Sequence, residues 1–469
     1  MGVTDTVTAS NIDHVDMGLP AAFVWDYDAR RPRLGRLYEK SKVSQWNAAT
    51  DVDWLIDVDP GAVPKIAQFA DVDWGDGDPM IAALGARDNP DLLRDVVAQN
   101  HGWLISQFMH GEQGALVATA KICAAAESID DKYYAAAQVA DEARHVEAYQ
   151  RYLDKIGIAY PVSTPLHTLL DEVMGHRHVD LTFLGMQILV EGVALAAFSL
   201  GGAVLANPLI ANITELVRRD EARHVAFGVL SLSGRYDDMD PVDLAEREDF
   251  VLEACALMRD RFQPTQVWEH FGIDVAEATK RFEQGPDMQA FRALLFSKVV
   301  PNLRKLGLLT PKVREGFEQL GILKYERYID SATEAGELDP DEAAANTGDD
   351  PVVQFRAQLA GVERIAPEPV LMVLAGVVDK AALTEIEPAR IRLNVTGVDD
   401  GEWLLAIGGG DFSYEKAGPA TSADVTVDMD VSTWTDIVAG RVSAPAAAID
   451  GKIMIAGDIM KALALDSLL

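Results

Sequence analysis

The sequence predicts a multidomain protein, in which an all-α four-helix bundle with extra helices is followed by a small α+β domain. Three observations indicate this. The pentapeptide Asp-Glu-Ala-Arg-His occurs twice, at 141–145 and 220–224. Each copy is preceded by a lone glutamate 30 residues before its own glutamate. Beyond about residue 351, helical periodicity gives way to the apolar–polar alternation typical of strands.

The chain begins with an irregular N-terminal arm, residues 1–60, with one helical piece at 34–45. Residues 61–328 form the predicted helical domain. Its helical periodicity runs from 91 to 153 and again from 181 to 232, with a connection of about 25 residues between the two runs.

Each run is predicted to be a helical hairpin. The midpoint between Glu112 and Glu142 lies beside Ser128, a typical first residue of a helix. The midpoint between Glu191 and Glu221 lies beside Asn207-Pro208, where one helix should end and another begin. Fifteen residues along a helix cover about 22 Å, and an antiparallel partner returns the same distance. Both hairpins therefore bring their two glutamates to one height.

The repeated motif predicts metal ligands. Glutamate and histidine at i and i+3 project from one helix face, so a lone Glu-x-x-His is typical of an exposed face. Two copies with matched partners and turns instead match the ligand set of a dimetal site in a four-helix bundle. Glu191 lies in the apolar stretch 186–198, where a carboxylate must be paired or metal-bound. The candidate ligands are Glu112, Glu142, His145, Glu191, Glu221 and His224.

An acidic linker is predicted at 329–351, because residues 329–350 hold eight acidic residues and no lysine or arginine. Residues 352–469 form the predicted α+β domain. Its expected strands are 391–396, 403–407 and 425–429. Its expected helices are 371–382, 431–439 and 459–465.

Bulk properties exclude several partners. The formal charge of −33 disfavours nucleic acid and anionic membranes. The apolar stretch 186–210 contains Glu191 and Asn207-Pro208, so a bundle helix explains it better than a membrane span. The two cysteines, Cys123 and Cys255, imply no disulfide framework, and no signal peptide opens the chain. These features predict a cytoplasmic protein.

At its two repeated motifs the chain resembles the hydroxylase subunits of bacterial multicomponent monooxygenases. It is also similar to the ribonucleotide reductase small subunit and to ligand-binding oxidases, over residues 30–320. Val190-Glu-Gly-Val193 and residues 219–228 resemble the motifs that these families have in the second half of their ligand set. The resemblance implies a ferritin-like di-iron fold with the six candidates as iron ligands.

The resemblance also assigns neighbouring residues. Asp141 would orient His224, and Asp220 would orient His145, because a ligand imidazole needs its second nitrogen anchored. Arg144 and Arg223 would complete the set of contacts around the ligand histidines. Alternatively, they have a plain surface or ion-pair role. Tyr149 falls where ribonucleotide reductase carries its radical tyrosine, although a packed tyrosine with a bonded hydroxyl is an alternative.

Two positions depart from related families. Leu195 stands where hydroxylases usually have a threonine one turn after the third glutamate. Val217 stands where arylamine N-oxygenases of this superfamily have a third histidine, which disfavours that activity.

The C-terminal segment resembles a sterol carrier protein 2 domain. Residues 423–429, 434–440 and 449–458 carry this resemblance, which implies an apolar tunnel for lipids or other hydrophobic ligands. Dimerisation or substrate entry is an alternative role for such a domain.

Oxygen and imidazole ligands suit two iron ions, with manganese as an alternative in one or both positions. The leading hypothesis is an O2-dependent di-iron monooxygenase acting on a hydrophobic small-molecule substrate. It would need an external electron donor, a reductase or ferredoxin, because the sequence has no Gly-rich dinucleotide loop or cysteine cluster. The alternatives are a ligand-binding oxidase or tyrosyl-radical protein, and a non-catalytic lipid carrier with a structural metal. A homodimer is implied by the resemblance.

Overall fold

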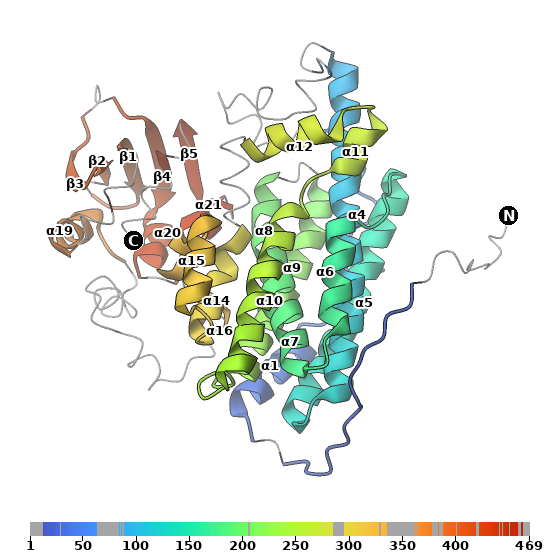
Figure 1. Ribbon diagram of the computed structural model, residues 1–469. Coiled ribbons are helices and arrows are strands. Elements are labelled where there is room, and N and C mark those ends of the chain that lie inside the picture. The colour runs from blue at the N-terminus through green and yellow to red at the C-terminus, as the bar shows by residue number, and fades with distance from the viewer. Residues whose placement is uncertain are drawn as a thin grey trace.

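The computed structural model of the chain describes residues 13–62 except 29, then 84, 86, 89–204, 207–284, 295–327, 330–334 and most of 362–462. Figure 1 shows a bundle of long helices joined to a separate sheet domain that contains the C-terminus. Each part has its own hydrophobic core. The predicted fold class, a helical domain followed by a small α+β domain, is confirmed.

The first hairpin of the bundle consists of α4 (Pro90–Ala125) and α5 (Ile129–Ile156). The side chain of Asn89 caps α4 by accepting a hydrogen bond from the Leu92 backbone N–H. Ser128 caps α5 in the same way, as the sequence predicts. Gly157 ends α5 in the left-handed conformation, with φ of 68°.

The second hairpin consists of α7 (Val179–Phe183), the π-helix η4 (Leu184–Val190), α8 (Glu191–Val204) and α9 (Pro208–Leu232). Asn207 caps α9, and Pro208 occupies its first turn, where the missing N–H costs nothing. The backbone N–H of Glu191 bonds to the Met186 carbonyl, the i to i−5 pattern of a π-helix. Such wide turns are frequent at functional sites.

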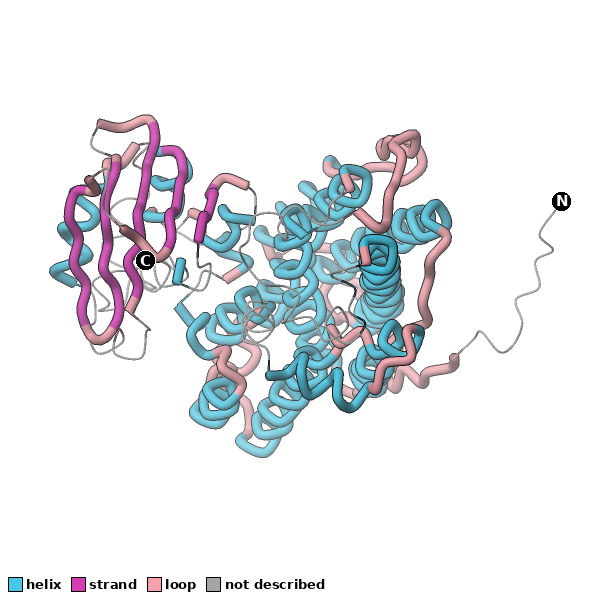
Figure 2. The backbone as a smooth tube through the Cα atoms, turned by 90° about the horizontal axis from the view of Figure 1, so that it is seen from above, coloured by secondary structure: helices cyan, strands magenta, loops and turns pink. Residues whose placement is uncertain are grey.

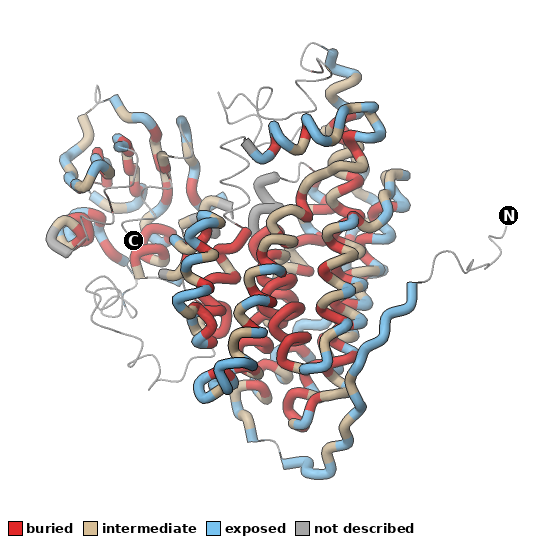
Figure 3. The backbone as a smooth tube through the Cα atoms, viewed as in Figure 1, coloured by how far each residue is buried: buried red, intermediate tan, exposed pale blue. Residues whose placement is uncertain are grey.

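The continuous helical run Val179–Phe198 is long and apolar enough to cross a membrane, but 94% of its most apolar 18-residue window is buried inside the fold. It packs against α4, α9 and α10, as a core helix does. Figure 3 shows the buried residues concentrated where these helices face one another. This agrees with the predicted bundle helix.

Shorter helices surround the bundle. Helix α1 (Pro32–Val43) lies against α5 and α9, with Leu34 and Leu37 fully buried. The other helices that the described residues form around the bundle are α6 (Thr164–Gly175), α10 (Pro241–Asp260), α11 (Thr265–His270), α12 (Val275–Gln284), η5 (Leu295–Lys298), α14 (Val300–Lys305), α15 (Pro311–Gln319), η6 (Leu323–Arg327) and α16 (Ser331–Glu334).

The C-terminal domain contains a five-stranded sheet in the order β3-β2-β1-β4-β5. Strands β1 and β4 are parallel, and the other neighbours are antiparallel. Figure 2 shows the strands side by side, with helices beside them. The elements are α19 (Pro367–Val377), β1 (Ala389–Thr396), β2 (Glu402–Gly408), β3 (Asp411–Lys416), β4 (Val425–Asp430), α20 (Val431–Val438), α21 (Ala444–Ile449) and β5 (Ile453–Gly457).

The structure differs from the sequence predictions in a few places. The connection between the hairpins contains α6, and the predicted helix 371–382 begins four residues earlier. Residues 330–334 of the predicted linker are packed: Ser331 is buried, and its N–H donates to Asn302 Oδ1 over 2.8 Å. The rest of the linker and most of the predicted helix 459–465 lie outside the described residues.

Candidate metal centre

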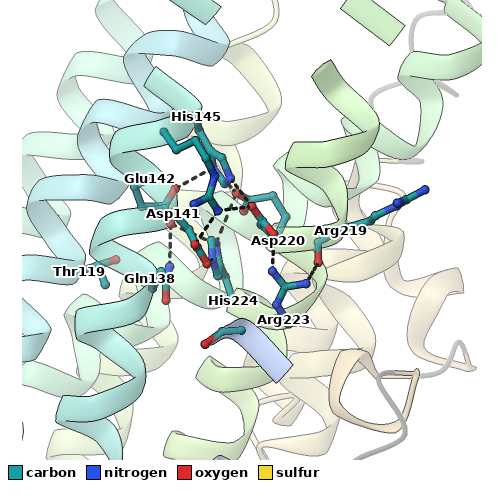
Figure 4. A network of polar contacts seen from close by, with 12 residues as sticks. Thr119, Gln138, Asp141, Glu142, His145, Arg219, Asp220, Arg223 and His224 are labelled. Atoms are coloured by element: carbon teal, nitrogen blue, oxygen red, sulfur yellow. Dashed lines mark hydrogen bonds and ion pairs between the residues drawn. The ribbon is translucent and has the colours of Figure 1, made fainter. Parts of the chain in front are cut away.

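The six candidate ligands lie together at the centre of the bundle. Each is at most 5% exposed. They come from all four bundle helices, because the matched spacings bring each pair to one height. Figure 4 shows Glu142 and His145 from α5 facing His224 from α9. Two ligand groups are formed, Glu112–Glu142–His145–Glu221 and Glu142–Glu191–His224, with donor atoms within 4.8 Å of one another in each.

Glu142 and Glu221 each reach both histidines. Glu142 Oε2 lies 3.1 Å from Nδ1 of His145, and its Oε1 lies 3.1 Å from Nδ1 of His224. Oε1 of Glu221 lies 3.3 Å and 3.5 Å from the same two nitrogens. These two carboxylates would therefore help to hold cations bound here, while Glu112 lies at the His145 end and Glu191 at the His224 end.

The other imidazole nitrogens contact aspartates from the opposite motif. Nε2 of His145 lies 3.0 Å from Asp220, and Nε2 of His224 lies 3.3 Å from Asp141. A carboxylate at this nitrogen holds the ring proton there and leaves the Nδ1 lone pair facing the glutamates. The structure thus makes the crossed contacts that the resemblance implies.

Several atoms of the cluster are suited to cations and form no hydrogen bond of ordinary geometry. Both carboxylate oxygens of Glu221, Oε2 of Glu191 and Nδ1 of His224 are buried and accept or donate no hydrogen bond within the described residues. Buried polar atoms are nearly always paired, so such a set indicates missing ligands. With two divalent cations, four carboxylates would be neutralised. The residues therefore fit a pair of metal ions.

The electrostatics of the metal-free cluster support the same fit. Burial raises the pKa of Glu112 to about 8, and the nearby carboxylate of Glu221 adds to the rise. Burial also raises the pKa of Glu191 well above its ordinary value, again with a contribution from Glu221. Burial alone would lower the pKa of His145, but Glu112 and Asp220 raise it well above its usual range. Protons thus occupy the cluster where cations would otherwise balance the charge.

Two glutamines that sequence reasoning missed complete the inner cluster. Nε2 of Gln138 donates to Glu142 Oε1 over 2.9 Å and to Glu191 Oε1 over 2.7 Å. Gln187, in the π-helix, donates to Gln138 and more distantly to Glu191. Each glutamine precedes a candidate ligand by four residues, Gln138 before Glu142 and Gln187 before Glu191. That repeated spacing was a signal in the sequence.

The N-terminal arm also contributes to the centre. Nε1 of Trp46 donates to Asp220 over 2.8 Å, and its ring stacks on His145 at 6.2 Å. Gln45 donates to Asp141 over 2.9 Å. The arm was predicted as a separate irregular segment, and no local pattern marked these two residues as neighbours of the motifs.

Arg144 and Arg223 support the two aspartates. Arg144 contacts Asp141 at 2.6 Å and Asp220 at 2.9 Å, and its guanidinium lies over the Trp46 ring. Arg223 pairs with Asp220, and Figure 4 shows this contact at the edge of the cluster. Both side chains are mostly buried, at 10% and 12% exposure, so they are not ordinary surface pairs.

Aromatic side chains cover one end of the centre. Tyr149 is fully buried, and its ring contacts Phe108 and Phe198, which pack edge to face on each other at 4.9 Å. The Tyr149 hydroxyl lies close to the Thr214 side chain, although the two form no hydrogen bond of ordinary geometry. Burial and the nearby Glu112 raise its pKa well above the ordinary value. Leu195 and Val217 are buried in the same domain.

Comparisons with solved structures find R2-like ligand-binding oxidases at low identity. One mutant with an anaerobically reconstituted Mn/Fe cofactor is 19% identical, with a TM-score of 0.35, covering 59% of this chain and 94% of that one. The aerobically reconstituted Mn/Fe form after a long soak is 17% identical, with a TM-score of 0.31, covering 65% and 95%. A sec-alkylsulfatase from Pseudomonas sp. is 15% identical, with a TM-score of 0.19, covering 70% and 51%.

No curated protein matches the chain at a significant level. A family model matches its C-terminal part. The match covers residues 374–469 and begins within α19, so it includes the whole sheet. The C-terminal domain is therefore a domain of the SCP-2 sterol transfer family.

Proposed function

We propose that the chain is an O2-activating di-iron oxidoreductase, and specifically a monooxygenase that hydroxylates a hydrophobic organic substrate. The observation that carries the proposal is the pair of ligand groups that share Glu142 at the centre of the bundle. Oxygen and imidazole donors favour iron or manganese over metals that prefer thiolates. When bound, two such ions supply reductive activation of O2.

The chain's own residues would hold and shield the centre. Asp141 and Asp220 keep a proton on Nε2 of each histidine, so Nδ1 is free to bind a cation. Gln138 fixes the carboxylates of Glu142 and Glu191 relative to each other. The rings of Phe108, Tyr149 and Phe198 exclude water at one end, as a reactive oxidant requires.

Other parts of the proposal concern partners. Both cysteines are free, with Cys255 buried, so electrons would come from an external reductase or ferredoxin. We expect the SCP2 domain to bind a hydrophobic ligand, which would suit a hydrophobic substrate of the bundle. We also expect a homodimer.

Oxygen uptake tests the proposal. Metal-free protein loaded anaerobically with Fe(II) and then mixed with O2 should consume O2 and give the absorption of oxidised iron. The Glu142→Gln variant should lose this uptake, because it replaces one carboxylate oxygen of the residue that both ligand groups share. The Glu147→Ala variant is the control, because Glu147 is exposed on the same helix and pairs with Arg151. If fully loaded protein consumes no O2, the proposal is wrong.

A second candidate function is a ligand-binding oxidase that stores a tyrosyl radical. The fully buried hydroxyl of Tyr149 favours it, because the hydroxyl is close enough to Glu112 for that carboxylate to raise the pKa of the tyrosine. Electron paramagnetic resonance after O2 exposure should then show a tyrosyl signal that Tyr149→Phe abolishes. Tyr152→Phe is the matched control, because Tyr152 is equally buried on the same helix but bonds to His101. A silent spectrum contradicts this candidate.

A further inference from the structure

Arg261, at the C-terminal end of α10, is a buried cation without an anionic partner. Its side chain is 3% exposed, and its backbone N–H bonds to Leu257. Its guanidinium donates only to the Met258 sulfur, at 3.7 Å, and lies over the Phe262 ring at 4.9 Å. No carboxylate within the described residues forms an ion pair or hydrogen bond with it.

The other buried lysine and arginine side chains of the described chain donate hydrogen bonds to oxygen acceptors. Arg247, also 3% exposed, forms two hydrogen bonds with Asp180, at 3.0 Å and 3.1 Å. Lys121 donates to the carbonyls of Met174 and His176, at 2.7 Å and 2.9 Å. A buried charge without such partners is costly, so the exception at Arg261 needs another explanation.

The position of Arg261 connects it to the candidate metal centre. Its Nη2 lies 3.8 Å from where a Cβ on Gly111 would be, nearer than any other described atom outside the adjoining part of α4. Gly111 directly precedes Glu112 on α4, and Phe108 lies one turn before Glu112 on the same face. The guanidinium therefore lies beside the residue that precedes a candidate ligand, and Glu112 is the charged group that raises the pKa of Arg261 against the effect of burial.

We propose that Arg261 is the binding site for the carboxylate of the substrate, which is an amphiphilic organic acid with an apolar body. The inference rests on the proposed function, and it gives that function a substrate class. The planar guanidinium can donate two parallel hydrogen bonds to a carboxylate. One carboxylate neutralises one guanidinium, whereas a phosphate carries about −1.5 to −2 charges and would leave excess negative charge beside Glu112.

Binding to the metal-free protein in the absence of O2 tests this site separately from the oxidation. The probes are octanoate, 1-octanol and octyl phosphate, titrated calorimetrically into the full chain. Octanoate should bind, and Arg261→Met should weaken its binding by about tenfold or more while binding of 1-octanol is unchanged. Arg259→Met is the matched control, because Arg259 lies on the same helix, is 38% exposed and pairs with Asp260. It should leave both affinities unchanged.

Thermal unfolding provides a second measurement. Methionine in place of an unpaired buried charge should raise the melting temperature of the ligand-free protein. A lower melting temperature would show that Arg261 is a structural residue and would overturn the proposal. So would unchanged octanoate affinity in Arg261→Met, which would place octanoate binding elsewhere, such as the SCP2 domain.

The remaining outcomes separate the two proposals. Tighter binding of octyl phosphate than of octanoate would overturn the carboxylate assignment. If Arg261 binds octanoate but the iron-loaded protein consumes no O2, the proposed oxidase function fails and the anion site stands. If the iron-loaded protein consumes O2 but octanoate does not bind, only the anion site is refuted.

Discussion

Oδ2 of Asp220 lies 3.0 Å from Nε2 of His145 and connects α9 to α5 across the centre of the bundle. The same oxygen accepts hydrogen bonds from Trp46 Nε1 and Arg144 Nη2. One carboxylate thus links the N-terminal arm and both hairpins to a single imidazole. The orientation of His145 therefore depends on residues from three separate segments.

Asp220→Asn should lower metal affinity about 10- to 100-fold, because the amide holds the His145 proton less firmly and breaks the arginine contacts. Titration of the metal-free protein with Fe(II) or Mn(II) measures the change. Asp154→Asn is the control, because Asp154 is an exposed aspartate on α5. Equal affinities of Asp220→Asn and the unmodified protein would show that the contact does not support metal binding.

Glu112→Ala and Glu191→Ala should each reduce the metal content below two ions per chain. Each change removes the carboxylate at one end of the cluster. The metal-free variants should also melt at a higher temperature, because a buried carboxylate beside other carboxylates is lost. Elemental analysis and calorimetry measure the two effects, with Glu147→Ala as the exposed control. Unchanged metal content would refute the ligand assignment.

Gly228→Ala should destabilise the protein by about 1–3 kcal/mol, because the new methyl group overpacks the core. A Cβ at this position would lie 2.5 Å from Gln187 Cβ and 3.1 Å from Ile188 Cδ1. Denaturant unfolding measures the loss. Gly35→Ala is the matched control in α1, where nothing lies within 4 Å, and it should stabilise the helix by about 0.5–1 kcal/mol. Equal effects of the two changes would contradict the predicted clash.

The histidine at position 101 should make stability depend on pH. Burial lowers the pKa of His101 from 6.5 to about 4, and Nε2 lies 2.7 Å from the Tyr152 hydroxyl. Between pH 6.5 and about 4, His101 therefore binds a proton more readily in the unfolded chain than in the folded one. The contribution of neutral His101 is complete above pH 6.5 and is lost as pH falls toward 4.

Unfolding free energies measured from pH 7.5 to 4.5 should therefore fall less steeply for His101→Gln than for the unmodified protein. Over that range the unmodified protein should lose about 2–3 kcal/mol more unfolding free energy than His101→Gln, as expected from the size of the pKa shift of His101. His270→Gln replaces an exposed histidine and is the control. Parallel curves for His101→Gln and the unmodified protein would contradict the prediction.

The bundle and its six central side chains could be predicted because they depend on local patterns. Ligand spacing, helix periodicity and the caps at Ser128 and Asn207 are all written within short stretches of sequence. The crossed aspartate–histidine contacts were expected from the family resemblance at the repeated motif, and the structure contains both of them.

The remaining contacts depend on tertiary packing and could not be derived in the same way. Trp46 reaches Asp220 across 174 residues, and Arg261 comes to lie beside Gly111 only through the packing of α10. The strands β3 and β5 are short, with exposed positions at most sites, so their apolar pattern is weak. The glutamine spacing was present in the sequence, and it acquires meaning only beside the carboxylates it contacts.

The π-helix before Glu191 makes this part of the chain sensitive to insertions and deletions. Its one extra residue per turn sets which way Glu191 faces relative to α7. Deleting a residue between Gln187 and Glu191 would restore regular helix and change the spacing that brings both side chains to Gln138. The length of the chain between these two residues is therefore constrained independently of which residues fill it, and substitutions there should be tolerated better than a change in length.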